Sequence, residues 1–275
     1  DLLSLVATRE VVHGGVRQTY LSSYHYKQVG KSMKKAIIMG ATSGIGREVA
    51  LLLAEKGWKV GVAGRRQQML DDLTSLSENI STSRQIDVTQ DDAPHILLDM
   101  IKEMGGINMY FHSSGIGWQN TELDIEKELL TVSTNAMGVT RMVDTMFNYF
   151  TEHPDKEGHI AVISSIAGTK GLGAAPSYSA TKRFVNHYLE CLTQLCTIRR
   201  ISNIRIHDIR PGFVRTPLIS GATYPMQLDV KPVAKDIIRG IERGKSIITV
   251  DWRYRILVAL WRLIPRWIWV RIRIH

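Results

Sequence analysis

Short apolar runs of four to seven residues alternate with longer stretches of helical pattern along most of the chain. The predicted strands are residues 36–39, 58–63, 83–86, 108–112, 159–163, 203–209 and 246–250. The predicted helices are residues 47–56, 67–78, 91–104, 122–150, 176–199 and 232–243. This alternation predicts an α/β fold: a Rossmann-like, doubly wound parallel sheet built from right-handed βαβ units in a single domain.

The two ends of the chain do not follow this pattern. Residues 1–32 show no clear period, and Met33 stands directly before the first predicted strand. We interpret 1–32 as an extension outside the fold: a leader, a remnant of cloning, or sequence upstream of a natural start. We therefore divide the chain into this extension, one domain over 33–251, and an amphipathic segment rich in Arg and Trp over 252–275.

A glycine-rich turn joins the first predicted strand to the first predicted helix. Its sequence is Gly40-Ala41-Thr42-Ser43-Gly44-Ile45-Gly46. Because Gly has no Cβ, such a turn lets the backbone approach a ligand closely. The helix that follows points free N–H groups and its positive dipole end at that ligand, which suits a phosphate. An ordinary strand-to-helix turn would also account for these glycines, so the stretch alone leaves both interpretations open.

Ligands on parallel sheets bind beyond the carboxyl ends of the strands. The segments that follow the predicted strands hold the candidate site residues of this chain. These segments are 40–46, 64–66, Asp87, 113–117, 164–165 and 211–216.

Tyr178 and Lys182 lie four residues apart in a predicted helix, so their side chains share one face. A free phenol has a pKa of about 10, and a neighbouring ammonium group lowers that pKa by stabilising the phenolate. Ser165 ends the strand upstream of this pair, where its hydroxyl can hold a carbonyl oxygen beside the Tyr proton. A half-buried Tyr with a solvated Lys is also common by chance, and a serine at a strand end is ordinary.

The order and spacing of these residues resemble the classical short-chain dehydrogenase/reductase family. The resemblance covers about residues 34–250, through 40–46, Asp87-Val88, Asn135, Ser165, Tyr178-x-x-x-Lys182 and Pro211-Gly212. Each motif is weak alone, and their common order makes the match specific. The resemblance implies a dinucleotide-binding catalytic domain that interconverts a ketone and a secondary alcohol.

The resemblance also implies a role for each matching residue. Tyr178 is then the general acid/base, Lys182 lowers its pKa and binds the nicotinamide ribose, and Ser165 orients the carbonyl oxygen. Asn135 holds a proton-relay water, and Asp87 and Val88 contact the adenine. The implied coenzyme contacts are Gly40, Thr42, Ser43, Gly44, Ile45, Gly46, Asp87, Val88, Ser114, Gly115, Asn135, Tyr178, Lys182, Pro211, Gly212, Val214 and Thr216. We choose Ser165 over Ser164 because Ser165 begins the family-like Ser-x-Ala-Gly run.

One motif departs from the family pattern. The family has Asn-Asn-Ala-Gly after the fourth strand, where this chain has His112-Ser113-Ser114-Gly115. The glycine that lets backbone pass the coenzyme is retained, whereas the two amide side chains that brace the sheet are missing. We therefore expect altered bracing at this point and intact proton transfer.

The end of the second predicted strand indicates which coenzyme is bound. NAD-preferring enzymes place an acidic residue there to bind the ribose 2′-hydroxyl. Here Gly64 is followed by Arg65 and Arg66, which can clamp a 2′-phosphate by charge-assisted hydrogen bonds. The other interpretation is a solvated pair at a helix start, where cations are slightly unfavourable. We predict NADP(H), with NAD(H) as the second choice, and carbonyl reduction as the direction.

Positive charge is concentrated at the two ends. The formal net charge is +9, yet residues 33–251 hold 25 basic and 24 acidic side chains. A nearly neutral body argues against a nucleic-acid surface, and the His, Cys and acidic residues lack metal-ligand spacing. Cys191 and Cys196 fall on different faces of one predicted helix, so we expect no disulfide and a reducing, cytoplasmic location.

Residues 252–275 contain four Trp and six Arg but no acidic residue. Because Arg interrupts every apolar run, we expect no membrane-spanning helix. Two interpretations stay open: an amphipathic helix lying on an anionic membrane surface, or a helix packed on the body or on a partner subunit with its Trp buried. Charge segregation favours the membrane surface, and with it a peripheral location.

The segment 217–230 is the predicted substrate lid. Its apolar side chains favour a hydrophobic ketone or alcohol, and membrane contact would favour 3-ketosphinganine-like, 3-oxoacyl or steroid-like compounds. Two other functions remain: a catalytically silent NADP(H)-binding regulator and a membrane-surface scaffold. The silent regulator is disfavoured because a pure binder has no need of Ser165, Tyr178 and Lys182. The resemblance implies a homodimer or homotetramer packed through the two long helices.

Overall fold

The computed structural model describes residues 7–13, 16–22, 33–219, 224 and 226–272. The chain divides into two compact units, residues 1–32 and residues 33–275. In the first unit, β1 (Ala7–His13) pairs antiparallel with β2 (Val16–Ser22). The sequence pattern predicts no strand here. Both strands mix charged and β-branched residues, so no apolar period marks them, and the pairing is carried by backbone hydrogen bonds.

A seven-stranded sheet forms the centre of the second unit, with strand order β5-β4-β3-β6-β7-β8-β9. Each neighbouring pair is parallel. The strands are β3 (Lys35–Met39), β4 (Lys59–Gly64), β5 (Ile80–Gln85), β6 (Met109–His112), β7 (Gly158–Ile163), β8 (Ile204–Pro211) and β9 (Ile247–Val250). The chain runs outward from β3 in one direction and from β6 in the other, so the switch point lies between them. The predicted Rossmann-like sheet is confirmed.

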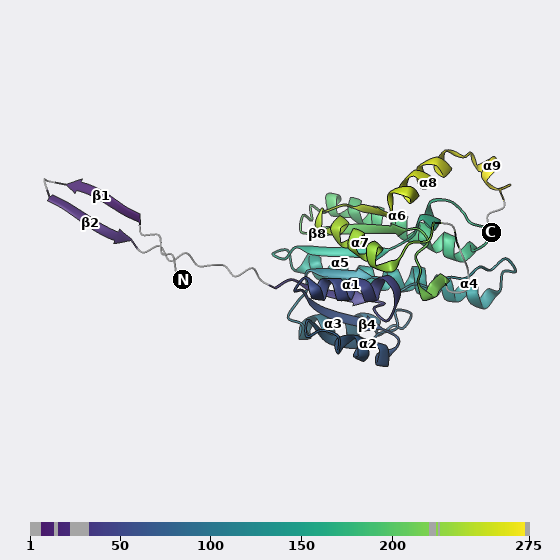
Figure 1. Cartoon of the computed structure of the whole chain (residues 1–275), viewed down its shortest axis with the longest axis horizontal. Coiled ribbons are helices and arrows are strands. Elements are labelled where there is room, and N and C mark those ends of the chain that lie inside the picture. Colours follow the sequence, from purple (N-terminus) through teal and green to yellow (C-terminus); the bar gives the residue numbers. More distant parts are fainter. Residues whose placement is uncertain (1–6, 14–15, 23–32, 220–223, 225, 273–275) are drawn as a thin grey trace. The chain divides into compact units, whose positions relative to one another are not determined.

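Helices cover both faces of this sheet (Figure 1). One face carries α1 (Gly44–Glu55), α2 (Gln67–Thr74) and α7 (Val230–Glu242), and the other carries α3 (Ala93–Glu103), α5 (Val139–Glu152) and α6 (Pro176–Ile198). Along β3, Ile38 enters the first core, whereas Ile37 and Met39 enter the second. Because both faces are covered, the strand is apolar at successive positions instead of alternating.

The helix predicted over 122–150 is three segments in the structure. α4 (Ile125–Val132) leads into a π-helical turn (Ser133–Gly138), which leads into α5. Asn135 lies in this turn and is fully buried. A π-helical turn widens the helix by one residue and is frequent at functional sites.

The C-terminal segment forms two short helices, α8 (Trp252–Leu263) and α9 (Arg266–Trp269). Pro265 separates them, because it has no N–H for a helical hydrogen bond and its ring would clash with the preceding turn. Tyr254 and Trp269 are buried, and Leu257, Val258 and Trp261 pack against the core. Among the described residues, no helix has the length and apolarity that crossing a membrane requires.

Candidate active site

The glycine-rich turn is closely packed at two of its glycines. Gly40 has a φ of +85°, and a Cβ at this position would lie 2.6 Å from the Ser114 nitrogen. A Cβ on Gly46 would lie 2.3 Å from the Gly40 carbonyl oxygen. Gly40 therefore needs both the left-handed conformation and the absence of a side chain, and Gly46 needs the absence of a side chain.

The amino end of α1 is open beside this turn. Ser43 precedes the helix in an extended conformation, and its side chain makes no capping hydrogen bond. The Arg66 guanidinium donates hydrogen bonds to Thr42 Oγ1 and, at 3.2 Å, to Ser43 Oγ. The free backbone N–H groups at the start of α1 and the nearby Arg66 guanidinium are the donors that an anionic group such as a phosphate requires.

Asp87 and Val88 follow β5 in a tight turn at the same edge of the sheet. The Asp87 carboxylate accepts hydrogen bonds from the Thr89 backbone nitrogen at 3.0 Å and from its hydroxyl at 2.8 Å. Val88 is buried, and a Cβ on Gly138 would lie 2.6 Å from its Cγ2 atom. Hydrogen bonds from Thr89 thus fix Asp87, and close packing against Gly138 of the π-helical turn fixes Val88.

The segment after β6 passes through the middle of the site. A Cβ on Gly115 would lie 3.4 Å from both Asn135 Oδ1 and Lys182 Nζ, so these two side chains converge on Gly115. A Cβ on Gly117 would lie 2.3 Å from the Tyr178 ring. The sequence pattern predicts Gly117 at the sheet edge but indicates no role for it. The structure shows that the ring of Tyr178 occupies the space of its missing side chain.

Asn135 is held in a fixed orientation by the segment after β6. Its side-chain nitrogen donates to the Ile116 carbonyl at 2.7 Å, and its side-chain oxygen accepts from the Ile116 nitrogen at 2.9 Å. A side-chain amide that makes both bonds to one residue cannot rotate without losing both. Asn135 therefore joins the π-helical turn to the backbone that carries Gly115.

Ser165 and Tyr178 lie together. Ser165 is buried at the end of β7, and its Oγ accepts from the Ala167 nitrogen at 3.1 Å. Burial raises the pKa of Tyr178, and a hydrogen bond with Ser165 acts in the opposite direction. The two hydroxyls are therefore placed to hold a single oxygen atom between them.

Lys182 is buried one helical turn after Tyr178. Its ammonium lies 5.6 Å from the centre of the Tyr178 ring and donates to the Ile163 carbonyl at 3.0 Å. Burial lowers the pKa of Lys182 to about 8, and the negative charge of Asp208 opposes that shift. The ammonium lies beside the Tyr178 ring, but burial keeps the pKa of Tyr178 above its ordinary value in this structure, so the lowering expected from Lys182 is not seen here.

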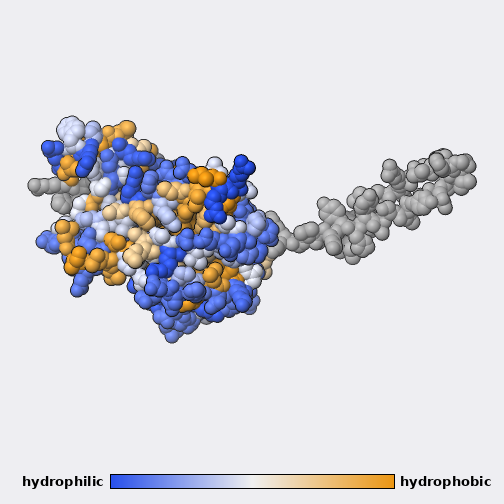
Figure 2. Space-filling model, turned by 180° about the vertical axis from the view of Figure 1, so that it is seen from behind, coloured by the Kyte–Doolittle hydropathy of each residue, from blue (hydrophilic) through white to orange (hydrophobic). Residues whose placement is uncertain are grey.

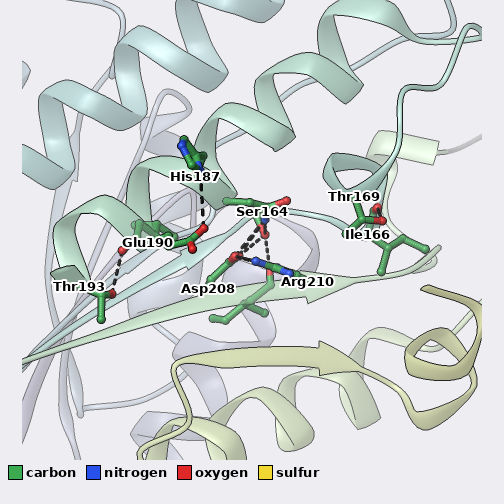
Figure 3. A network of polar contacts seen from close by, with 11 residues as sticks. Ser164, Ile166, Thr169, His187, Glu190, Thr193, Asp208 and Arg210 are labelled. Atoms are coloured by element: carbon green, nitrogen blue, oxygen red, sulfur yellow. Dashed lines mark hydrogen bonds and ion pairs between the residues drawn. The ribbon is translucent and has the colours of Figure 1, made fainter. Parts of the chain in front are cut away.

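Asp208, which no sequence motif marks, lies on β8 beside Ser164 (Figure 3). Its buried carboxylate accepts hydrogen bonds from Ser164 Oγ, from Asn186 at 3.0 Å and from Arg210 Nε at 2.7 Å. Ser164 thus turns its hydroxyl toward Asp208, whereas its neighbour Ser165 faces Tyr178. In the sequence, the only signal for this pair is that Asp208 and Arg210 stand two positions apart at the end of the predicted strand 203–209.

His112 occupies the position where the family pattern has its first Asn. It is fully buried, and its Nδ1 lies 2.8 Å from the Tyr110 hydroxyl. Burial, aided by the positive charge of Lys182, lowers the pKa of His112 to about 3. Its Nε2 is a buried atom without a hydrogen-bond partner among the described residues. A neutral His–Tyr pair therefore stands where the family pattern has an amide side chain.

The segment after β8 closes the other side of the glycine-rich turn. The Thr216 side chain lies within 3.1 Å of where a Gly44 Cβ would stand, and Val214 bridges to Leu228. Phe213 stacks on Tyr224 with ring centroids 4.2 Å apart. The 3-10 turn Pro217–Ile219 begins the predicted lid, of which residues 220–223 and 225 lie outside the described residues.

A cavity of about 350 Å³ lies at the opposite, amino-terminal edge of the sheet. Its lining includes Lys34, Trp58, His159 and Arg205, and none of the predicted site residues. The candidate residues are instead gathered at the carboxyl edge, where they form a single constellation.

Comparison with known proteins agrees with the family resemblance seen in the sequence motifs. Residues 34–224 match the family described as short chain dehydrogenase. An uncharacterized oxidoreductase of Myxococcus xanthus is 29% identical over 245 residues, which is 85% of this chain and 94% of that protein. An 11-beta-hydroxysteroid dehydrogenase-like protein of Arabidopsis thaliana is 27% identical over 247 residues, covering 84% of this chain and 78% of that protein.

Solved structures share the fold. A short-chain dehydrogenase/reductase of Burkholderia phymatum in complex with NAD has a TM-score of 0.73 at 19% identity, covering 83% of this chain and 92% of that one. A short-chain dehydrogenase of Sphingobium yanoikuyae in complex with NADPH has a TM-score of 0.70 at 21% identity, covering 88% and 97%. Since these two relatives hold different coenzymes, the shared fold does not determine the choice between them.

Proposed function

Because the chain belongs to the short-chain dehydrogenase family, we propose that it is an NADP(H)-dependent oxidoreductase that interconverts a ketone and a secondary alcohol. One observation carries the proposal. Tyr178, Lys182, Ser165 and Asn135, which come from three separate parts of the chain, converge beside the glycine-rich turn. A structural role would not require this set of proton-transfer groups at one place.

Tyr178 is the proposed proton donor. In reduction the ketone gains a hydride at carbon and a proton at oxygen, and the coenzyme supplies the hydride when it is bound. Tyr178 gives its hydroxyl proton to the carbonyl oxygen, and Lys182 stabilises the phenolate that remains. The proton that restores Tyr178 comes from solvent. The balance is ketone, NADPH and one proton giving alcohol and NADP⁺.

Ser165 and Asn135 have supporting roles in this proposal. The Ser165 hydroxyl holds and polarises the carbonyl oxygen beside the Tyr178 hydroxyl. Asn135 fixes the segment 115–116 and holds the water through which the proton reaches Lys182. The paired hydrogen bonds between Asn135 and Ile116 support the first of these two tasks.

The residues present fit a dinucleotide. Gly40, Gly44 and Gly46 let the turn pack closely against Ser114, Thr216 and its own backbone, and the start of α1 beside it is uncapped. In this proposal Asp87 and Val88 contact the adenine, and the residues that contact the nicotinamide end are Ser114, Gly115, Pro211, Gly212, Val214 and Thr216. Ile45, one residue into α1, is buried below the turn and supports it from the core.

The preference for NADP(H) rests on Arg65 and Arg66. β4 ends at the buried Gly64, so no carboxylate occupies the position that binds a ribose 2′-hydroxyl. Arg66 already bends over Thr42 and Ser43, and Arg65 is exposed beside it. Two guanidinium groups at this corner favour a 2′-phosphate.

The substrate we propose is apolar. The lid contributes the exposed Leu218 and Met226 and also Tyr224, whose ring stacks on Phe213 just before the lid. The likeness to the Arabidopsis protein agrees with a steroid-like ketone, and a 3-oxoacyl or 3-ketosphinganine-like compound fits the same surface. We further propose a homodimer or homotetramer, because α4, the π-helical turn and α6 expose Leu129, Met137 and Phe184.

A ketone screen with NADPH and with NADH tests the proposal. We expect apolar ketones to consume NADPH faster than NADH, and a short water-soluble ketone to be reduced slowly. A chain that binds NADPH yet reduces no ketone and oxidises no secondary alcohol would instead be the silent regulator. A chain that binds neither coenzyme would leave only the scaffold function of residues 252–275.

A further inference from the structure

α8 is apolar on the face that points away from the protein. Trp252, Ile256, Leu260 and Leu263 follow each other at spacings of four, four and three residues, which places them in one stripe along the helix. Their exposed fractions are 59%, 51%, 60% and 78%. On the opposite face, Tyr254 is buried and Leu257 and Trp261 pack against the core. The helix is therefore apolar on both faces, and its own protein covers only one.

Arginines border this outward stripe. At 100° per residue, Arg255 and Arg262 fall along one edge of the stripe and Arg253 along the other. Arg253 pairs with Asp251 at 2.9 Å, whereas Arg255, Arg262 and Arg266 form no ion pair with any described residue. Beyond Pro265, Trp267 and Val270 are also exposed, at 66% and 64%.

The inner face of the same segment holds the two loops that bound the active site. Trp261 and Trp269 donate from their indole nitrogens to Thr169 Oγ1 at 2.8 Å and to the Gly171 carbonyl at 2.7 Å. Lys170 donates to the Ile264 carbonyl at 2.7 Å. These contacts reach the loop between Ser165 and Tyr178.

The second loop is the base of the lid. The Tyr254 hydroxyl accepts from the Phe213 nitrogen at 3.1 Å and donates to the Met226 carbonyl at 2.9 Å. A helix with its side chains is about 10 Å thick, so the outward stripe lies roughly one helix diameter from both loops. The space-filling view shows apolar side chains bordered by polar ones at the end of the unit that carries α4, α8 and α9 (Figure 2).

We propose that the outward face of α8 and α9 docks on an anionic lipid bilayer, with the mouth of the active site at the bilayer surface. The stripe enters the boundary between headgroups and acyl chains, and the bordering arginines bind lipid phosphates. Trp252 and Trp267 stand near the two ends of the stripe, and Trp favours such an interface. The exposed Leu218 and Met226 of the lid extend the apolar surface toward the site.

Charge complementarity selects an anionic bilayer over a second copy of this chain as the occupant. Residues 252–275 hold six Arg and no acidic residue, so a second copy docked on the same stripe would bring like charges together. A bilayer of anionic lipid accepts cations along the whole length of the stripe. The consequence rests on the proposed reductase function: an apolar ketone dissolved in the bilayer reaches the site without crossing water.

Sedimentation with vesicles tests the docking itself. We expect the full chain to sediment with phosphatidylcholine–phosphatidylglycerol vesicles and much less with phosphatidylcholine alone. Ile256→Glu with Leu260→Glu should reduce binding at least about tenfold, because charged groups replace the inserted side chains. Arg255→Gln with Arg262→Gln should reduce it about fivefold per charge. The matched control is Leu76→Glu, which puts the same charge at an exposed leucine of the body, 57% exposed, and should bind as the natural chain does.

Turnover then separates the docking from the reductase function. The Ile256→Glu, Leu260→Glu variant should lose turnover of a long-chain ketone held in anionic vesicles and keep turnover of a short soluble ketone. If the natural chain reduces neither ketone, the reductase proposal fails while sedimentation still decides the docking. Equal sedimentation of the natural chain and the stripe variant would overturn the docking. So would a natural chain that forms an oligomer in solution which the stripe variant does not, because the stripe would then join copies of this protein.

Discussion

The carboxyl edge of the sheet and the outward face of α8 depart from the usual burial pattern in opposite directions. At the sheet edge, Asn135, Lys182 and Asp208 are buried polar groups, each with hydrogen-bond partners. On α8, Leu260 and Leu263 are exposed apolar groups. Buried polar groups and contiguous exposed apolar patches are the two informative exceptions to ordinary burial. The comparison shows one region built to act on a molecule brought inside and another built to bind a surface outside.

The largest effect should follow from removing the hydroxyl of the first region. Tyr178→Phe keeps the ring that fills the space over Gly117 and deletes the proton donor. We expect kcat to fall about 10²- to 10⁴-fold, the usual contribution of general acid catalysis, with NADPH affinity retained. Stopped assays of ketone reduction and fluorescence titration of NADPH measure the two quantities. Tyr188→Phe, a half-buried tyrosine on the same helix, is the control and should keep full activity.

A smaller effect should follow at the cationic corner of the same region. Arg66→Ala removes the guanidinium beside Thr42 and Ser43, and a charge-assisted hydrogen bond contributes about 1.5–3 kcal/mol. We expect KM for NADPH to rise about 10- to 100-fold, with KM for NADH nearly unchanged. Arg84→Ala, at an exposed arginine paired with Glu103, should leave both values unchanged. An equal rise for both coenzymes would place Arg66 at the shared diphosphate and not at the 2′-phosphate.

The pH profile sharpens the electrostatic part of the account. The pKa of Lys182 is about 8, so its ammonium, and with it fast reduction, should be lost as the pH rises through that value. The negative charge of Asp208 raises the pKa of Lys182 and so opposes the effect of burial. Asp208→Asn should therefore lower it further and move the alkaline fall in kcat to lower pH. Asp229→Asn, at an exposed carboxylate paired with Arg215, should leave the profile in place. An alkaline limb that does not move would show that Asp208 acts only through packing.

The smallest effect should appear where the two regions join. Tyr254→Phe removes the hydroxyl that links Phe213 and Met226, leaving the Phe213 nitrogen short of a partner. We expect the free energy of unfolding in urea to fall by about 1–3 kcal/mol. Tyr224→Phe deletes a hydroxyl that meets only the exposed Gln119 among the described residues, and should change it by less than about 0.5 kcal/mol. Equal losses in the two variants would mean that Tyr254 does not tie the tail to the lid.

The sheet and its order of motifs were predictable from the sequence, because buried parallel strands are apolar runs and their carboxyl ends meet at one edge. The need for Gly117 was not predictable, since it arises from a tyrosine ring brought there by a helix far along the chain. The π-helical turn at Asn135 was also hidden, because its residues continue an ordinary helical pattern. Asp208 could be recognised only once its strand was known to be buried, because a buried acid requires a partner such as Arg210.

The tail was predictable in part. Its composition indicates an amphipathic helix. Because apolar residues occur on both faces of that helix, the sequence does not reveal which face the protein covers. Tyr254 and Trp261 turn inward because the Phe213 nitrogen, the Met226 carbonyl and the Thr169 hydroxyl offer them hydrogen-bond partners. These partners lie far from residues 252–275 in the sequence, so only the folded structure shows that they are close. The hairpin β1–β2 was missed because its strands carry no apolar period.

Hydride transfer with Tyr178 as proton donor is the central claim, and isotope labelling tests it most directly. NADPH deuterated at both C4 positions is supplied with an apolar ketone, and the alcohol is analysed by mass spectrometry. The account predicts that the natural chain yields alcohol with deuterium at the former carbonyl carbon, and that Tyr178→Phe yields almost none. Unlabelled alcohol from the natural chain, or labelled alcohol formed equally fast by Tyr178→Phe, would contradict it.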